Sequence, residues 1–598
     1  MISAAAAILR TLDALGARQI FGIPGVHNLA LYRALRSNER TRHVTARHEC
    51  GAGFMADGCS RAGVGVGVAF VISGPGLTNV ITAMGEAFHD SIPLIVVSTL
   101  PPRSMLDRGR TGCLHELRDS GAVARSVAKT SVRIERADDI AHAIAAAFSV
   151  ATSGRPGPAH IEVPLDLLDK LVPAEIVQSA ASAGRAAIDA AQARSRCAAE
   201  SDVDAAVAAL AAAQCPALIV GGGAVAAAAP LRRLAERLGA VALETAAGKG
   251  VVGDAHALGL GARLHFPSVR RFVEEDADVV LAVGTELSPA DTWRDTFVPR
   301  GRLVQINIDA AQLGRGGGCS GSGSGSTLRS VAIEADASAA TEIILGHPAL
   351  RAVPDGARAA GEARAAALRS GARAEASRVM ASLGVPAEQH EPQIALLRAL
   401  SAALGDDGTL VADMTVPAYL ALSEFPCVAP RRFLHPVGYG TLGYALPAAI
   451  GHCVGGGGAP VAVLVGDGGF QFTMAELAVA VELELPLPIV VWNDEGYGAI
   501  RHAMRSEDTA VAAAEAAAEE GGAGDGSTRD ASAASPLVGV DHAPLDFRLL
   551  AEAYGARFAA PDDEAELRQS IEEALAVERG ARPTLIELRA DTFARRRC

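Results

Sequence analysis

Two short polar turns, each following an apolar run, could together bind a phosphorylated ligand and a divalent cation. The apolar runs are residues 461–465 and 488–492, and the turns are GDGG at 466–469 and NDEG at 493–496. Short apolar runs bounded by glycine-bearing turns are typical of buried strands. In an open α/β sheet, ligands bind just beyond the carboxyl ends of strands, so we expect both turns at one crevice.

The residue types in these turns are those that bind diphosphate and Mg²⁺. Gly466, Gly468 and Gly469 offer backbone N–H groups at a helix start, which suits a diphosphate. Asp467 and Asp494 add carboxylate oxygens, and magnesium typically uses one or two carboxylates together with substrate phosphates. The two turns are therefore predicted to form a Mg²⁺-diphosphate clamp.

The elements that must position this clamp are two strands with an amphipathic segment at 473–484 between them. An ordinary βαβ unit with glycine turns would show the same elements. A lone Gly-Asp-Gly favours that ordinary unit, whereas the complete order of strand, turn, helix, strand and turn favours a cofactor site.

The composition of the whole chain indicates a large α/β protein without a nucleic-acid partner. At 598 residues it is too long for one hydrophobic core, and three domains are expected. A formal charge of −14, with 49% hydrophobic and 4% aromatic residues, leaves no basic footprint for nucleic acid or anionic lipid. Residues 1–16 are typical of an amphipathic helix and not of a signal peptide.

Cysteine usage and hydropathy favour a cytoplasmic location without a membrane span. The nine cysteines are odd in number and contain no Cys-x-x-Cys pair, which fits reduced thiols and neither a disulfide nor a zinc framework. The alanine-rich run at 205–229 is interrupted by Gln214, Pro216 and three glycines, so it is not predicted to cross a membrane.

Alternating helical and apolar patterns divide the chain into three α/β blocks at 1–172, 195–345 and 385–598. Each is predicted to fold as a doubly wound parallel sheet. The stretch before residue 195 is interpreted as a linker, and the Ala/Arg-rich segment near 350–380 as a helical connector. Two low-complexity tracts are expected to be a flexible loop at 314–326 and a disordered insertion at 510–535.

The clamp resembles the binding motif of thiamine-diphosphate enzymes, which begins with Gly-Asp-Gly and closes with a paired Asn some 27 residues later. Here the closing pair is Asn493-Asp494, so Asp494 stands where most members of that family supply an Asn. Some acetolactate-forming members are similar in having Asp at this position. The resemblance implies that Asp467, Asp494 and the backbone carbonyl of Gly496 bind Mg²⁺, and that thiamine diphosphate is the cofactor.

Two further motifs carry the same resemblance. Glu49, in the run RHECGAG, falls where these enzymes place a carboxyl that hydrogen-bonds N1′ of the aminopyrimidine, and GPGLTN follows at 74–79 with the family spacing. A carboxyl in a poorly solvated site can share a proton with that nitrogen. In the turn GTLG at 440–443, the carbonyl of Gly440 and the N–H of Leu442 would bind the pyrimidine, and the Leu442 side chain would enforce the V shape of the cofactor.

The resemblance covers nearly the whole chain and implies pyrimidine-binding, central and diphosphate-binding domains. In this family the cofactor lies between the first domain of one subunit and the third domain of its partner. A homodimer or a dimer of dimers, with active sites at the interface, is therefore expected.

The shared reaction of the family is the decarboxylation of a 2-oxo acid, a small molecule. The run FGIPGVHNL at 21–29 is similar to the opening motif of pyruvate decarboxylases, although Val26 replaces the acidic residue used there for proton transfer. His115 is single where those enzymes carry a His pair. It is a candidate proton-transfer group or a structural histidine, and His27 is a weaker candidate.

The substrate prediction depends on local details. The runs IPGVHNLALYR, SGPGLTNVITAMGEAF and LHEL look most like 2-ketoarginine decarboxylases, which act on 5-guanidino-2-oxopentanoate. A guanidinium substrate would need a carboxylate partner, and Glu116, Glu286 and Glu495 are candidates, each of which could equally be a solvated or capping acid. The Arg-containing segment of flavin-binding acetolactate synthases is absent at 283–289, so bound FAD is not expected.

Two other functions remain open from the sequence. The chain could be an acetolactate-synthase-type carboligase that uses pyruvate, because the two subfamilies differ only in what happens to the carbon that loses CO₂. The third hypothesis is a non-catalytic paralogue that binds the cofactor. Asp494 and the long insertion after the clamp suggest it weakly.

Overall fold

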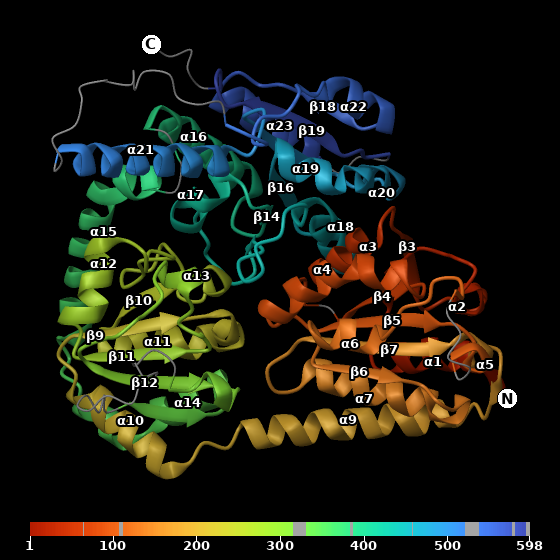
Figure 1. Ribbon diagram of the computed structural model, residues 1–598. Helices are drawn as coiled ribbons and strands as arrows, with labels where there is room; N and C mark the ends of the chain where they lie inside the picture. The colour runs from red at the N-terminus through yellow and green to blue at the C-terminus, as the bar shows by residue number, and fades with distance from the viewer. Residues whose placement is uncertain are drawn as a thin grey trace.

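A computed structural model of the chain describes residues 1–63, 65–106, 112–314, 330–382, 385, 387–456, 458–520, 537–576 and 580–593. It contains three parallel sheets with helices packed on both faces, which confirms the predicted fold class (Figure 1). The sheets follow one another along the chain, and the third lies above the other two in the view of Figure 1. The predicted domain boundaries remain predictions.

The first sheet has six parallel strands in the order β3-β2-β4-β5-β7-β6. Strands β4, β5 and β7 are buried along their whole length, as their apolar sequences require. The strands are β2 (Gln19–Gly22), β3 (Arg42–Thr45), β4 (Gly67–Val71), β5 (Leu94–Leu100), β6 (Thr130–Arg133) and β7 (Pro158–Pro164). The main helices are α1 (Ala4–Ala14), α2 (Leu29–Leu35), α3 (Glu49–Arg61), α4 (Pro75–His89), α6 (Ser120–Arg125), α7 (Ile140–Thr152) and α9 (Ile176–Ser195).

The second sheet has five parallel strands in the order β10-β9-β11-β12-β13. The strands are β9 (Pro216–Val220), β10 (Val241–Glu244), β11 (Val279–Val283), β12 (Arg302–Asn307) and β13 (Val331–Glu334). The main helices are α10 (Glu200–Ala212), α11 (Ala228–Leu238), α12 (Pro267–Arg271), α13 (Pro289–Thr292), α14 (Ala337–Gly346) and α15 (Ala357–Ser382).

The third sheet has six parallel strands in the order β15-β14-β16-β17-β19-β18. The strands are β14 (Thr409–Ala412), β15 (Phe433–Leu434), β16 (Val461–Gly466), β17 (Pro488–Asn493), β18 (Arg557–Ala559) and β19 (Thr584–Arg589). The main helices are α16 (Ala387–Leu404), α17 (Val416–Glu424), α18 (Ala445–Gly455), α19 (Asp467–Thr473), α20 (Leu477–Glu482), α21 (Gly498–Glu520), α22 (Phe547–Tyr554) and α23 (Glu564–Leu575).

Helices α3 and α18 join the first and third domains by close backbone packing. A Cβ at Gly451 would collide with the backbone carbonyl of Met55, and one at Gly58 would collide with that of Ala448. Glycine at these positions lets the two helices approach closely. The first and third sheets therefore lie on either side of a shared buried layer that includes Phe54.

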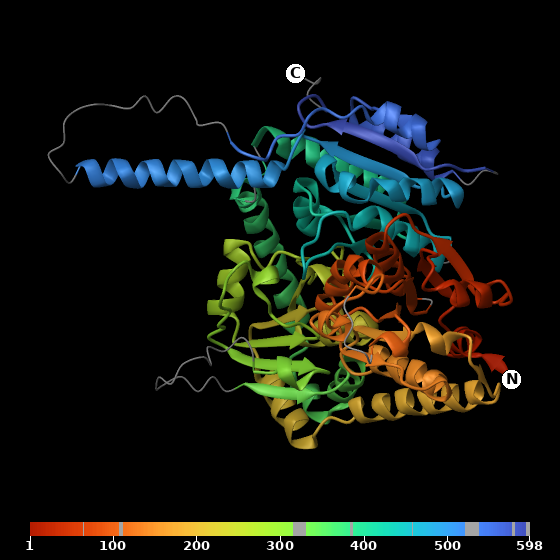
Figure 2. The ribbon, with the colours of Figure 1, turned by 45° about the vertical axis from the view of Figure 1, so that its right-hand side comes forward.

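The connecting segments differ in part from the sequence-based expectations. The stretch before residue 195 is helix α9, which packs against α1 and α7 and is not a loose linker. The predicted helical connector is α15. The first part of the expected disordered insertion, 510–520, belongs to α21, which projects away from the rest of the protein (Figure 2). The remainder of that tract, and all of the 314–326 tract except Gly314, lie outside the described residues.

Among the described residues, no helix combines the length and apolarity needed to span a membrane.

Candidate active site

The two turns of the predicted clamp lie side by side at the carboxyl edge of the third sheet. Gly466 at the end of β16 pairs with Trp492 near the end of β17, which brings the segments after both strands level with each other. Gly466 caps α19, so Asp467, Gly468 and Gly469 form the first turn of that helix. The backbone N–H groups of a first helical turn have no intrahelical acceptor.

Asp467 and Asp494 face each other in this crevice. The side chain of Asp467 is buried, and its Oδ1 has no hydrogen-bond partner among the described residues. Burial, and then the adjacent Asp467, raise the pKa of Asp494 to about 7. Two carboxyl groups held this close favour binding of a divalent metal ion, although the charge of Arg501 acts on the pKa of Asp494 in the opposite direction. In the described part of the chain, no cluster of three or more His, Cys, Asp or Glu side chains is arranged for a metal. The predicted ligand set contains only two such side chains, because its third ligand is a backbone carbonyl.

A segment far along the chain crosses the clamp. The backbone N–H of Tyr497 donates to the carbonyl of Val540 at 2.8 Å, and that of His542 donates to the carbonyl of Glu495 at 2.9 Å. His542 Nδ1 lies 3.4 Å from Asp467 Oδ2, and its ring meets that of Tyr497 edge to face. No motif indicated His542, because a low-complexity tract separates it from the clamp in the sequence.

Asp413, at the end of β14, holds the turn at 440–443 beside the clamp. Its carboxylate accepts from the backbone N–H groups of Met414, Gly443 and Ala445 at 2.9, 3.1 and 2.9 Å. Burial raises the pKa of Asp413 to about 6, although these donors act in the opposite direction. This residue was missed in the sequence, where it is one acid after an apolar run.

The turn at 440–443 is adjacent to the diphosphate turn. A Cβ placed on Gly469 would lie 3.6 Å from Cδ2 of Leu442 and 2.9 Å from Oδ1 of Asp413. Gly440 and Gly443 have φ values of +70° and +83°, which other residues rarely adopt. The structure thus brings Gly440 and Leu442 to the same edge of the third sheet as the clamp.

Glu49 begins helix α3 at the carboxyl edge of the first sheet. Its Oε2 accepts a hydrogen bond of 2.9 Å from the side-chain amide of Asn79 on α4. The preceding residues are anchored by Glu476 of the third domain, whose carboxylate accepts from the backbone N–H groups of Arg47 and His48. Burial raises the pKa of Glu476 to about 7.

His115 and His27 lie together at this edge of the first sheet. Their ring centroids are 4.8 Å apart, and the rings meet edge to face. The two candidates, which the sequence treated as separate single histidines, therefore form a pair in the folded chain.

Within one chain, Glu49 and the segment just before the turn at 440–443 contact different parts of α4. Asn79, the partner of Glu49, is in the first part of that helix. A Cβ on Gly85 would lie 2.8 Å from Cζ of Tyr439, and Asp90 accepts from the backbone N–H of Gly438. At about 1.5 Å of rise per residue, Asn79 is roughly 9 to 16 Å along α4 from the residues that contact Gly438 and Tyr439.

Three family models match the chain in the order of its three sheets. They are described as "Thiamine pyrophosphate enzyme, N-terminal TPP binding domain" for residues 2–122, "Thiamine pyrophosphate enzyme, central domain" for 203–322 and "Thiamine pyrophosphate enzyme, C-terminal TPP binding domain" for 417–588.

The chain belongs to the thiamine pyrophosphate enzyme family.

Similarity to individual thiamine pyrophosphate enzymes extends over most of the chain. It is 38% identical over 591 residues to the "Probable 2-ketoarginine decarboxylase AruI" of Pseudomonas aeruginosa, which covers 98% of this chain and 94% of that protein. It is 29% identical over 502 residues to the acetolactate synthase isozyme 1 large subunit of Escherichia coli, with 82% of each chain covered. It is 30% identical over 507 residues to the acetolactate synthase of Mycobacterium bovis, with 84% and 77% covered.

The residues at the carboxyl edge of the third sheet fit thiamine pyrophosphate (thiamine diphosphate). The glycine-rich start of α19 offers N–H donors for its phosphates. The buried Oδ1 of Asp467, which has no partner among the described residues, and the neighbouring Asp494 are oxygen donors that would suit a divalent metal ion bound together with phosphate. Gly496 lies two residues beyond Asp494, in a bridge with Asp541.

The carboxylates considered for a guanidinium substrate all have partners in the chain. Glu116 accepts from the backbone N–H groups of Gly112 and Cys113. Glu286 forms an ion pair of 2.5 Å with Arg155, and Glu495 forms one of 2.9 Å with Arg589. None of the three is an unpartnered acid, and the sequence alone did not indicate these pairings.

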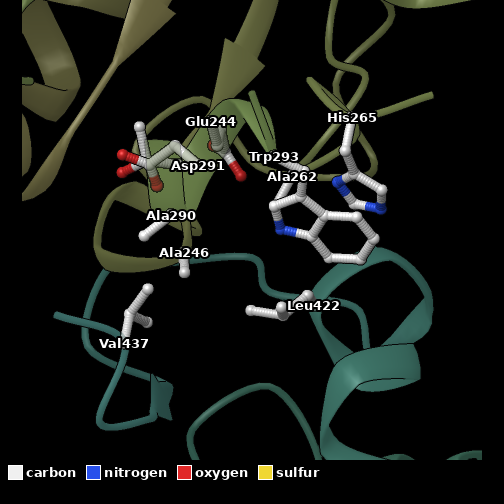
Figure 3. A pocket seen from close by; sticks show the side chains of 10 residues that line it. Glu244, Ala246, Ala262, His265, Ala290, Asp291, Trp293, Leu422 and Val437 are labelled. Carbon is white, nitrogen blue, oxygen red and sulfur yellow. The ribbon is translucent and has the colours of Figure 1, made fainter. Parts of the chain in front are cut away.

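A cavity of about 20 Å³ lies between the central and third domains (Figure 3). The ring of His265 stacks on that of Trp293 at one wall, and the carboxylate of Glu244 there accepts from three backbone N–H groups. A volume of about 10–15 Å³ holds one water molecule, so this cavity is too small for a 2-oxo acid. This cavity is therefore not a candidate for the substrate site.

Proposed function

We propose that this thiamine pyrophosphate enzyme decarboxylates a 2-oxo acid without oxidation, with Mg²⁺ as the metal and a substrate similar to 5-guanidino-2-oxopentanoate. The observation that carries the proposal is the 38% identity over 98% of the chain to a protein named as a probable 2-ketoarginine decarboxylase. When bound, thiamine diphosphate supplies a nucleophilic carbon and accepts the electron pair that CO₂ leaves behind. The chain binds, orients and shields the reactants.

Each predicted site residue has one role in this proposal. Asp467, Asp494 and the carbonyl of Gly496 bind Mg²⁺. The N–H groups at Gly466, Gly468 and Gly469 bind phosphate. Gly440 and Leu442 bind the pyrimidine, held in place by Asp413. Glu49 holds a proton at N1′, and Asn79 orients its carboxylate. His115 transfers a proton to the substrate.

We further propose a homodimer, or a pair of such dimers, in which each site combines two chains. The separation of Glu49 from the turn at 440–443 within one chain supports this arrangement, because one cofactor must contact both. Large apolar side chains are also exposed near both edges. They are Val26, Leu29, Met105 and Leu114 of the first domain and Tyr439, Phe472 and Ile500 of the third. Exposed apolar groups of this kind are typical of protein interfaces.

A mixing experiment tests the shared site. Glu49→Gln and Asp467→Ala variants are each expected to be inactive. In a mixed dimer, one site combines the intact Glu49 of one chain with the intact Asp467 of the other. Random exchange should then restore about a quarter of the wild-type activity, since half of the dimers are mixed and half of their sites are intact. If each chain held a complete site, mixing would restore nothing.

The alternative reaction is carboligation of pyruvate. It is supported by the 29–30% identity to acetolactate synthases. The purified protein with thiamine diphosphate and Mg²⁺ should be supplied separately with 5-guanidino-2-oxopentanoate and with pyruvate, and the products identified by NMR. Release of CO₂ with 4-guanidinobutanal supports the decarboxylase, whereas acetolactate from pyruvate would make it a carboligase. Turnover of neither would favour another 2-oxo acid or the non-catalytic paralogue.

Three further expectations remain proposals. Glu116, Glu286 and Glu495 stay candidates for the guanidinium partner. For Glu495, the exposed ion pair with Arg589 is worth only about 0–1 kcal/mol, so a substrate guanidinium could replace Arg589. A flavin is not expected in the central domain, where Gly221 and Gly223 after β9 donate to the carbonyls of Val283 and Gly284. The seven cysteines among the described residues are free, which supports a cytoplasmic location.

A further inference from the structure

We propose that His27 and His115 act as one proton-donating pair, which protonates the substrate carbon that has lost CO₂ and so releases an aldehyde. The inference rests on the proposed decarboxylase function. It adds His27, and Ser73 behind it, to the reaction, whereas the sequence favoured a single histidine.

The fold brings these residues together from three separate loops. His27 follows β2, Ser73 follows β4, and His115 lies in the segment after β5. In the sheet order β3-β2-β4-β5 these strands are neighbours, and Glu49 follows β3. Four adjacent parallel strands thus deliver their next segments to one carboxyl edge, which is where α/β sheets bind ligands.

The pair has a defined internal geometry. The ring centroids of His27 and His115 are 4.8 Å apart with an interplanar angle of 67°. Nδ1 of His27 is hydrogen-bonded to the hydroxyl of Ser73. Nδ1 of His115 is buried and, within the described residues, has no hydrogen-bond partner. One ring is therefore anchored to the sheet, and the other retains an unused buried nitrogen.

The backbone around His115 is shaped to keep this contact. His115 has a φ of +62°, which is uncommon for a residue other than glycine. Gly74 also has a φ of +62°, and a Cβ there would lie 2.6 Å from the carbonyl oxygen of His115. Backbone conformations of this kind cost free energy and are concentrated at functional sites.

Two imidazoles in contact hold one proton more readily than two. Burial, and then the charge of His115, lower the pKa of His27. Because two positive charges at a centroid separation of 4.8 Å repel each other, a pair with one charged ring and one neutral ring is favoured. A pair in this state can give up one proton and recover it from solvent, since both side chains are half-buried and not sealed.

The proton balance of the step is simple. The N–H bond of the imidazolium breaks and its electron pair stays on the ring nitrogen. A C–H bond forms from the electron pair that departing CO₂ left on the substrate carbon. The neutral pair is then protonated by water, so each turnover consumes one solvent proton and needs no oxidant or reductant. Without this donor, the same electron pair remains available to a second oxo acid or to an added oxidant.

The test compares two assays of the reconstituted holoenzyme with 5-guanidino-2-oxopentanoate. The first measures aldehyde formation, which needs the proton. The second measures reduction of the dye 2,6-dichlorophenolindophenol, which removes the electron pair before protonation. We expect His27→Asn to lower kcat for aldehyde by about 10²-fold, the scale of general acid catalysis, and to change its pH profile. Dye reduction, KM and thiamine diphosphate affinity should change little.

Matched variants separate this role from a structural one. His142→Asn, an exposed histidine on α7, should leave both assays unchanged. Ser73→Ala should reproduce part of the His27→Asn effect on aldehyde formation, because it removes the anchor alone. Glu49→Gln should abolish both assays.

The outcomes of these assays are distinct. If wild type forms no aldehyde and reduces no dye, the proposed function is wrong. If wild type is active and His27→Asn forms aldehyde at the wild-type rate, or loses both activities equally while folded, the pair is wrong. If His27→Asn does not fold, His115→Asn is measured in the same way and decides between these results.

Discussion

The side-chain amide of Asn79 donates a hydrogen bond of 2.9 Å to the carboxylate of Glu49, and so joins the first turn of α3 to α4. Hydrogen bonds to a charged group contribute about 1.5–3 kcal/mol. This contact fixes the direction of the one carboxylate that the sequence assigned to the cofactor ring.

Glu49→Gln is expected to remove most decarboxylase activity and to leave the dimer intact. Asn79→Ala should lower kcat by less, roughly 10- to 100-fold, because Glu49 remains but is no longer oriented. Steady-state kinetics with size-exclusion chromatography measure both effects. Near-full turnover by Glu49→Gln would contradict the assignment of Glu49.

Asp494→Asn should still bind Mg²⁺ and thiamine diphosphate. The amide keeps one oxygen ligand and removes the repulsion between two carboxylates, which after burial is the next cause of the raised pKa of Asp494. Asp467→Ala should lose metal-dependent cofactor binding, and Asp508→Asn on the exposed part of α21 is the control. Calorimetric titration of each protein with cofactor gives the affinities. Loss of binding in Asp494→Asn as complete as in Asp467→Ala would exclude this view of the clamp.

Asp413→Asn is expected to weaken cofactor binding and to destabilise the third domain. The carboxylate satisfies three buried N–H groups, whereas an amide would turn its own donor toward one of them. Each unsatisfied buried group costs about 1–3 kcal/mol. Thermal unfolding and cofactor titration should both report the change. A variant with wild-type affinity and stability would show that the turn at 440–443 does not depend on Asp413.

Glu86 predicts a loss of stability at alkaline pH. Burial, and then the charge of Asp90, raise its pKa from 4.5 to about 10, with Arg61 acting in the opposite direction. Because the folded state binds this proton more tightly than the unfolded state, the contribution is complete below about pH 4.5. It falls by up to about 1.4 kcal/mol per pH unit as pH rises toward 10.

Thermal unfolding at about pH 6 and about pH 9 tests this contribution. Between these values, the Tm of wild type should fall more than that of Glu86→Gln, whose neutral amide has no proton to lose. Glu507→Gln, exposed on α21, should behave as wild type. An equal fall in Tm for wild type and Glu86→Gln would mean that the Glu86 carboxyl does not resist ionisation.

The strands and turns of the predicted clamp could be located from the sequence because the pattern that indicates them is local. Strand, turn and helix follow one another between residues 461 and 496, and the apolar runs determine where each strand ends. The position of Glu49, as the first residue of a helix that follows a strand, could be predicted for the same reason. The fold class followed from the repeated alternation of apolar strands and amphipathic helices along the chain.

Other site features depend on contacts between distant segments, which no local pattern records. His542 lies 75 residues from Asp467, and His115 lies 88 residues from His27 (115 − 27). Their proximity arises from the order of strands in a sheet and from how each loop returns to its edge. The ion pairs of Glu286 and Glu495 are of the same kind.

The sequence by itself indicated the family and the α/β fold class, and it predicted which residues would bind cofactor and metal, because short motifs carry the chemistry of those groups. Only the tertiary structure decided that His27 and His115 form a pair, that Asp413 joins two cofactor turns, and that Glu49 lies apart from Gly440 within one chain. Strand order and helix packing place residues that are remote in sequence, and these arrangements are set by burial of whole apolar faces and not by any single motif.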